Sequence, residues 1–331
     1  MQPNRIINKT YIAKQSDELA KLIPAYIADD SLIEAVNIAA FLGRPLFITG
    51  DPGCGKTRLA EAIAAEWYLD KYKEFYFRWD IKSTTKAREG LYSFDNLKRL
   101  FDVQSSATNQ TVLHGKSFAR RGIKDLANYR SFGKLGEAFR KSTAENPAIL
   151  LIDEIDKAPI DFPNDLLLEL DEMKFFIPET NETIVAQQRP LLIITSNSEK
   201  EMPAAFLRRC VYHKIQFPTD QRLKEILETN KDVDTTLFED GITVFRAIRE
   251  VQEKNQQSGE KLVSTSEMID WFLYMSSATP ERKEQIKEQL EKGKIPAVQA
   301  LFKKREDAKL FPNNSVEIPK KEPKQLSYGK E

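Results

Sequence analysis

The sequence is poor in the side chains that build disulfide and zinc sites. It has two cysteines, Cys54 and Cys210, and two histidines, His114 and His213, in 331 residues. One cysteine pair cannot build a disulfide framework, and two histidines without a Cys-x-x-Cys pair argue against a zinc centre. The cysteine usage is typical of a protein in a reducing compartment, so we expect a cytoplasmic location.

The chain also has no excess of positive or negative charge and no long apolar run. Lys and Arg number 50, and Asp and Glu number 50. This balance argues against a general electrostatic grip on nucleic acid or on a membrane, although it leaves a local basic groove open. No apolar stretch is long enough to span a bilayer, and residues 1–14 have no apolar core like that of a signal peptide. We therefore expect no membrane segment.

A complete G-x-x-x-x-G-K-[ST] motif is the most informative stretch that the sequence does have. It consists of Gly50, Asp51, Pro52, Gly53, Cys54, Gly55, Lys56 and Thr57. A short apolar strand, 46–49, precedes it, and a helix, 57–66, follows. Backbone N–H groups of such a loop and the helix N-terminus cradle nucleotide phosphates, the lysine reaches the β and γ phosphates, and the hydroxyl of Thr57 binds Mg²⁺. A glycine-rich turn with a chance lysine is the alternative, and the flanking strand and helix argue against it.

A second motif places two carboxylates at the end of an apolar strand. The run 149–156 reads Ile-Leu-Leu-Ile-Asp-Glu-Ile-Asp. Open α/β sheets bind their ligands at the carboxyl ends of the strands. We expect Asp153 to hold Mg²⁺ and Glu154 to polarise the attacking water as general base. The alternative is that both carboxylates solvate a loop or cap a helix. Asp156 is interpreted as a capping or surface residue.

Two further candidates follow along the chain. Asn197 ends the next apolar strand, where its amide could bind both an attacking water and a phosphate oxygen. Arg208 and Arg209 follow a short helix before the last strand. Paired arginines are usually solvated, but here they would lie far from their own phosphate loop. An arginine supplied to a neighbouring subunit would neutralise transition-state charge, and that requires a ring.

Strands alternate with helices up to residue 217, and the pattern is helical beyond it. This order predicts an α/β fold with a doubly wound parallel sheet followed by an all-α domain. A helix is expected over 161–173 and a β-hairpin over 174–187. Helices are expected over 219–229, 236–257, 264–278, 281–291 and 295–309. From 311 the chain is rich in proline and lysine and is expected to be disordered.

Together, these motifs in this order resemble those of AAA+ ATPases. The sequence around 133–136, 166–173 and 203–210 resembles the MoxR-like, dynein-related branch. The resemblance implies a three-layer P-loop NTPase core over 1–217, a helical lid over 218–310 and a tail over 311–331. It also implies a helix-2 insert at about 92–120 and makes the 174–187 hairpin the one that precedes the sensor strand.

The resemblance further implies roles and partners. ATP and Mg²⁺ would be the ligands, Asp153 and Glu154 the magnesium and catalytic carboxylates, and Asn197 the sensor. Arg209 matches the arginine finger best, with Arg208 as the alternate. The family acts as hexameric, chaperone-like rings, and its usual partners carry von Willebrand factor A domains.

One departure and several alternatives stay open. The family's lid arginine is missing from 261–267, and Lys261 could replace it only without bidentate contact. Base preference, ATP or GTP, is not fixed by the loop, although Tyr26 and Ile27 could contact adenine. Two other functions are a nucleic-acid motor akin to McrB-type relatives in restriction systems and a nucleotide-binding scaffold. The intact Lys56 and Glu154 argue against the scaffold.

Overall fold

The computed structural model describes residues 7–108, 125–197, 201–255, 262–303 and 305–318. The chain divides into two units, one of residues 1–50 with 56–216 and the other of residues 51–55 with 217–331. No helix among the described residues is both long and apolar enough to cross a membrane.

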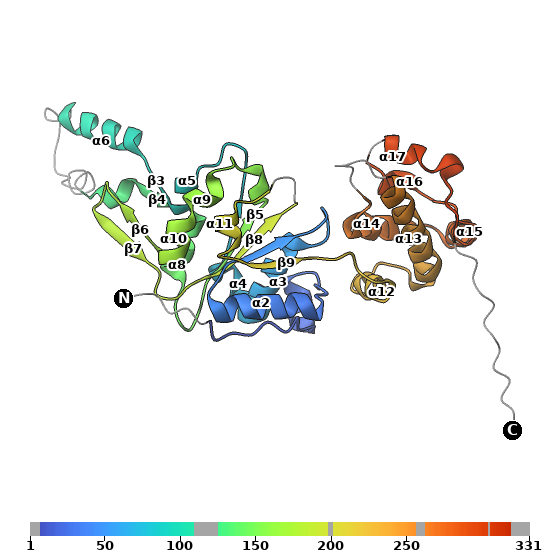
Figure 1. Cartoon of the computed structure of the whole chain (residues 1–331). Coiled ribbons are helices and arrows are strands. Elements are labelled where there is room, and N and C mark those ends of the chain that lie inside the picture. The colour runs from blue at the N-terminus through green and yellow to red at the C-terminus, as the bar shows by residue number, and fades with distance from the viewer. Residues whose placement is uncertain (1–6, 109–124, 198–200, 256–261, 304, 319–331) are drawn as a thin grey trace, which may run out of the picture. The chain divides into compact units, whose positions relative to one another are not determined.

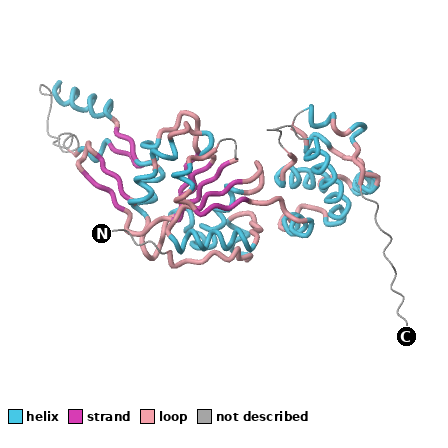
Figure 2. The backbone as a smooth tube through the Cα atoms, in the orientation of Figure 1, coloured by secondary structure: helices cyan, strands magenta, loops and turns pink. Residues whose placement is uncertain are grey.

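A five-stranded parallel sheet forms the centre of the first unit (Figure 2). In spatial order, its strands are β2 (Tyr76–Asp80), β5 (Ile149–Asp153), β8 (Leu191–Ser196), β1 (Leu46–Thr49) and β9 (Val211–Lys214). The three middle strands are buried along their whole length, as their continuous apolar runs predict for strands covered on both faces. All five strands end at one edge of the sheet, where the phosphate loop begins.

Helices cover both faces of this sheet, with α2 and α3 on one side and α8, α10 and α11 on the other (Figure 1). The helices of the first unit are α1 (Asp17–Leu22), α2 (Asp30–Leu42), α3 (Lys56–Tyr68), α4 (Tyr72–Phe75), α5 (Ala87–Leu91), α6 (Asn96–Thr108), α8 (Lys134–Lys141), α9 (Phe162–Asp165), α10 (Leu167–Glu172) and α11 (Ala204–Leu207). On the α8 side, Phe139 and Phe206 pack in one core with Phe47, Leu150 and Ile194 of the strands. The predicted α/β doubly wound fold is therefore confirmed.

Two small antiparallel sheets extend this unit. The hairpin of β6 (Lys174–Ile177) and β7 (Glu182–Val185) matches the predicted one. The pair of β3 (Tyr92–Phe94) and β4 (Arg130–Phe132) was not predicted, because its strands lie 35 residues apart in the chain and are three residues long. The predicted insert at 92–120 contains β3 and α6, and its residues 109–120 lie outside the described part.

The second unit is helical around a single apolar core. Its helices are α12 (Asp220–Glu228), α13 (Phe238–Asn255), α14 (Thr265–Ser276), α15 (Pro280–Glu291), α16 (Val298–Leu301) and α17 (Arg305–Lys309). Trp271 is fully buried in this core, and its indole N–H donates to the carbonyl oxygen of Pro296 at 2.6 Å. The side chains of Phe245, Phe272 and Leu290 pack in the same core.

Three local predictions were wrong. The helix expected over 161–173 is two short helices, α9 and α10, joined at Leu166, and the helix expected over 295–309 is two, α16 and α17. Disorder from 311 is wrong for 311–318. There, Phe311 is 2% exposed and stacks on Phe302 at 5.0 Å, and the N–H of Val316 donates to the carbonyl of Gly293. Burial of these apolar side chains stabilises an ordered conformation of 311–318, although the composition of the segment is polar.

Candidate functional site

The phosphate-loop motif lies between β1 and α3, as predicted. Gly53 and Gly55 have backbone φ angles of +76° and +91°. Residues with a side chain rarely adopt such angles, so the loop needs glycine at both positions. Lys56 is only 6% exposed, and its ammonium group donates to the carbonyl oxygen of Gly50 at 2.7 Å. The ammonium is therefore held against the start of its own loop.

Asp153 ends β5 and is held by hydroxyl groups from two neighbouring elements. The Thr57 hydroxyl, at the start of α3, lies 3.1 and 3.0 Å from its two carboxylate oxygens. The Thr195 hydroxyl, on β8, donates to Oδ1 at 2.6 Å. Thr195 also accepts the backbone N–H of Glu154 at 2.9 Å. Thr195 was not predicted, because no local motif marks it, but it is fully buried and contacts both carboxylate residues.

Glu154 turns the chain sharply away from the strand. Its φ of +58° is uncommon for a residue with a side chain, and such strain persists where neighbours enforce it, often at functional sites. Its carboxylate accepts from the Asn197 amide at 3.1 Å and pairs with Lys157. Burial alone would raise the pKa of Glu154. Hydrogen bonds from Lys157 and Asn197 and the charges of Lys157 and Lys56 outweigh burial and lower it.

Asn197 and Asp156 meet at the same strand edge. The backbone N–H of Asn197 donates to Oδ1 of Asp156 at 3.3 Å, while its side chain reaches Glu154. Asp156 is 1% exposed, so its interpretation as a capping or surface residue was wrong. It lies in a 3-10 turn, Ile155–Lys157, that contacts β8. The structure thus brings Lys56, Thr57, Asp153, Glu154 and Asn197 to one edge of the sheet.

A second cation, Arg78, contacts this group and was also missed. It lies on the edge strand β2, and its guanidinium donates to Oδ2 of Asp153 at 3.0 Å and to Oδ1 of Asp80 at 2.7 Å. The only sequence signal is a charged residue on each side of Trp79. That alternation becomes informative only when the pairing of β2 with β5 is known.

The donors at the strand edge fit a hard divalent cation. Carboxylate oxygens of Asp153 and the hydroxyl of Thr57 are ligands that Mg²⁺ accepts. Among the described residues, no group of three or more His, Cys, Asp or Glu could hold a metal ion. A cation here would therefore need further oxygens, such as those of water and nucleotide phosphates, which is how Mg²⁺ commonly binds.

Comparison with known proteins is consistent with this geometry. The sequence model of the ATPase family associated with various cellular activities (AAA) matches residues 46–219, which is more than half of the chain. The chain belongs to the AAA family. No curated protein matches it. Membership implies nucleotide-dependent ATPase activity, and AAA proteins bind ATP, typically with Mg²⁺, and usually assemble into rings.

The two candidate arginines of this AAA core differ in their surroundings. Arg209 donates to the Asp171 carboxylate at 2.7 Å and to the carbonyl oxygen of Ala205 at 2.9 Å. The exposed Arg208 guanidinium makes no hydrogen bond or ion pair within the described ranges. Both line a cavity of about 390 Å³ together with Arg44 and Arg189. This face therefore concentrates positive charge, and Arg208 is the less constrained of the pair.

The helical unit holds a buried arginine that was not predicted. Arg249, on α13, is 5% exposed, and its guanidinium donates to the carbonyl oxygen of Val263 at 2.7 Å and to Asp51 at 2.5 Å, both of the same unit. It also lies over the ring of Phe217. The predicted substitute, Lys261, lies outside the described residues.

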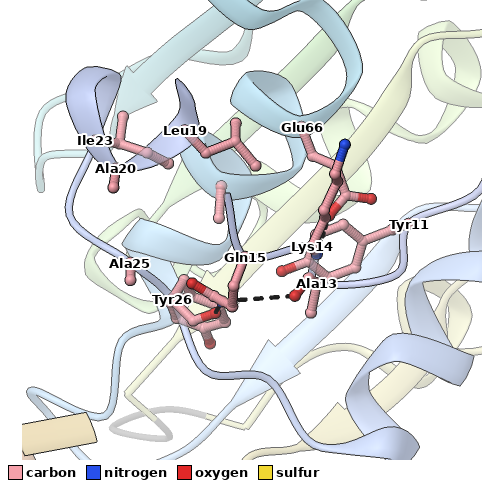
Figure 3. A pocket seen from close by; sticks show the side chains of 11 residues that line it. Tyr11, Ala13, Lys14, Gln15, Leu19, Ala20, Ile23, Ala25, Tyr26 and Glu66 are labelled. Carbon is pink, nitrogen blue, oxygen red and sulfur yellow. Dashed lines mark hydrogen bonds between the residues drawn. The ribbon is translucent and has the colours of Figure 1, made fainter. Parts of the chain in front are cut away.

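Tyr26, a candidate for contact with adenine, lines a small hollow under the N-terminal segment (Figure 3). Gln15 reaches across it and donates to the carbonyl oxygen of Tyr26 at 3.0 Å. On the opposite side, Glu66 of α3 accepts the backbone N–H groups of Ile12 and Lys14 at 2.8 and 2.7 Å. The hollow measures about 20 Å³, room for one water molecule and too little for a base. The adenine contact stays a prediction.

Proposed function

We propose that this protein is a MoxR-like AAA+ ATPase that binds and hydrolyses ATP with Mg²⁺ in a ring and uses the cycle to remodel a partner protein. One observation carries the proposal. The phosphate-loop residues Lys56 and Thr57 and the polar residues Asp153, Glu154 and Asn197 converge on one edge of the sheet. This is where open α/β sheets bind ligands, and the group combines a phosphate-binding cation, oxygen donors for a metal and a carboxylate base.

We assign the roles from these positions. Lys56 would bind the β and γ phosphates, and Thr57 and Asp153 would hold Mg²⁺, which neutralises phosphate charge when bound. Glu154 would accept the proton of the attacking water, and its lowered pKa keeps it ionised at neutral pH. Asn197 would orient that carboxylate and the water. The loop residues Gly50, Asp51, Pro52, Gly53, Cys54 and Gly55 would surround the phosphates, and all of them except Pro52, which has no N–H, could donate a backbone N–H.

An arginine from a neighbouring subunit would complete the site. The resemblance favours Arg209, whereas the local contacts favour Arg208, because Arg209 already pairs with Asp171. We therefore infer that Arg208 reaches the neighbour's γ-phosphate and that Arg209 fixes the end of α11 against α10. Neutralising transition-state charge in this way requires assembly, and a hexamer is the expected ring.

The remaining assignments follow the resemblance. Residues 1–217 would form the nucleotide-binding domain and 218–310 the lid. The β6–β7 hairpin and the 92–120 insert would act on the client, for which a protein with a von Willebrand factor A domain is our candidate. A cytoplasmic location fits the cysteine usage.

The test is Mg·ATP hydrolysis per subunit over a wide range of protein concentration, with light scattering on the same samples. A specific rate that climbs with assembly and then plateaus is expected, because each site needs its neighbour. A constant rate while the particle mass grows would contradict the shared site. Absence of hydrolysis in assembled rings would contradict the ATPase assignment. Salt-dependent binding of labelled DNA or RNA that stimulates turnover would instead favour the nucleic-acid motor.

A further inference from the structure

The Asp153 carboxylate forms an ion pair with an arginine of its own chain and accepts hydrogen bonds from two hydroxyl groups. Its Oδ2 accepts from the Arg78 guanidinium at 3.0 Å and from Thr57 at 3.0 Å, while Oδ1 accepts from Thr195 at 2.6 Å. The carboxylate is 6% exposed, so little water reaches it. Its negative charge is therefore balanced by Arg78 in the structure described.

The strand pairing explains why Arg78 reaches this carboxylate. Strand β2 runs parallel to β5, with Arg78 opposite Leu151 and Asp80 opposite Asp153. Side chains alternate between the two faces of a strand, so Arg78 and Asp80 share one face while Trp79 enters the core on the other. Because β2 is the edge strand among the described strands of this sheet, no further described strand lies beyond it to compete for the guanidinium.

Arg78 is shared between a buried carboxylate and an exposed one. The Asp80 side chain is 59% exposed, and its Oδ1 lies 2.7 Å from Arg78 Nη2. Burial lowers the pKa of Arg78, but the hydrogen bond and charge of Asp80 and the charge of Asp153 outweigh burial and raise it, so the cation is permanent. Asp80 could therefore hold the guanidinium without help from Asp153.

A guanidinium and a divalent cation on one carboxylate repel each other. The assigned role of Asp153, as a holder of Mg²⁺, requires the same oxygens that Arg78 now contacts. We propose that Arg78 is a positioning residue that competes with Mg²⁺ for Asp153, and that Asp80 holds the guanidinium when the metal is bound. The inference rests on the proposed function, because it deepens the account of the same site.

The opposing interpretation is an ion pair that only fastens the edge strand. The Arg78 side chain is 47% exposed but its partner Asp153 is 6% exposed, so breaking this pair would leave a buried carboxylate without its cation and destabilise the fold. If fastening were its whole role, substitutions would change unfolding and leave the Mg²⁺ dependence of nucleotide binding where it was. Competition instead predicts opposite shifts for the two partners of the pair, and that difference separates the interpretations.

The experiment measures binding rather than turnover. The affinity of the full chain for a fluorescent ADP is titrated at fixed free Mg²⁺ concentrations, and Mn²⁺ binding in the presence of ADP is followed by electron paramagnetic resonance. Arg78→Gln should lower the half-saturating metal concentration about fivefold, because it removes the competing cation. Asp80→Asn should raise it, because the guanidinium loses its second acceptor. Asp80 is exposed, so this variant should fold.

Controls separate competition from a general field effect. Arg88→Gln removes a pair between an exposed arginine and the half-buried Glu179 and should leave the metal dependence unchanged. Asp80→Asn introduced into Arg78→Gln should have no further effect, since Asp80 acts through Arg78. An equal shift in that background, or unchanged metal dependence in Arg78→Gln, overturns the inference and leaves the ATPase assignment standing. Wild-type protein that binds no nucleotide overturns both.

Discussion

Asn197 donates its side-chain amide to the Glu154 carboxylate at 3.1 Å, joining the ends of β8 and β5. The same residue uses its backbone N–H to contact the buried Asp156. The candidate base is thus oriented by a residue that is itself anchored to a buried carboxylate. Because the backbone of Glu154 is held at positive φ by its N–H bond to Thr195, both its main chain and its side chain are fixed.

Replacing Glu154 by Gln should separate binding from hydrolysis. The amide keeps the shape of the side chain and its reach to Asn197, but it cannot accept a proton. We expect near-normal ATP affinity and turnover slowed about 10²–10⁴-fold. Fluorescent nucleotide titration and phosphate release would measure the two effects. Glu145→Gln, an exposed carboxylate outside the site, is the control. Wild-type turnover in Glu154→Gln would exclude Glu154 as the base.

The pH profile should report the contacts of Glu154. Its pKa is lowered because Lys157 and Asn197 stabilise the charged form more than burial destabilises it. A base must be ionised, so activity is lost as pH falls through that pKa. Asn197→Ala or Lys157→Met raises the pKa and should move the acid limb of kcat/KM to higher pH.

The matched control for this profile is Lys134→Met. Lys134 forms the same i,i+3 pair with Glu137 on α8, away from the site. Its removal should leave the acid limb in place. An acid limb that stays fixed in both Asn197→Ala and Lys157→Met would show that another group sets the profile.

Local motifs predicted the central residues of this site. The other residues could be identified only from contacts between strands. Lys56, Thr57, Asp153 and Glu154 stand in two short runs whose residue types and flanking strands are informative on their own. Thr195 and Arg78 gain meaning only when β8 and β2 are placed on either side of β5. Asp156 was misjudged because composition does not show that its turn contacts β8 and that its side chain is buried. The break at Leu166 and the short β3–β4 pair also depend on tertiary packing rather than on periodicity.

Replacing Thr195 by Val should weaken both the fold and the site. The two side chains have nearly the same shape, but valine leaves the Asp153 carboxylate and the Glu154 N–H without this partner in a buried place. We expect the free energy of unfolding to fall by about 1–3 kcal/mol. Turnover should fall as well, because Glu154 loses its anchor. Thr195→Ser keeps the hydroxyl and serves as the control in chemical unfolding and in phosphate release. Equal losses in both variants would assign the effect to packing of the methyl group.

Mixed rings should identify the arginine that acts between subunits. Arg208→Ala should bind nucleotide normally yet inhibit wild-type protein in mixtures more steeply than simple averaging predicts, because each variant subunit disables its neighbour's site. Arg209→Ala should inhibit less, since its guanidinium already pairs with Asp171. Arg282→Ala, which removes an exposed arginine on α15 whose guanidinium bonds Gln285 of the same helix, is the control and should average linearly. The measurement is the ATPase rate against the fraction of variant at constant total protein.

Steep inhibition by Arg209→Ala with linear averaging by Arg208→Ala would reverse the assignment in favour of the residue that the family resemblance indicates. Linear averaging by both would mean that neither arginine acts across the subunit boundary.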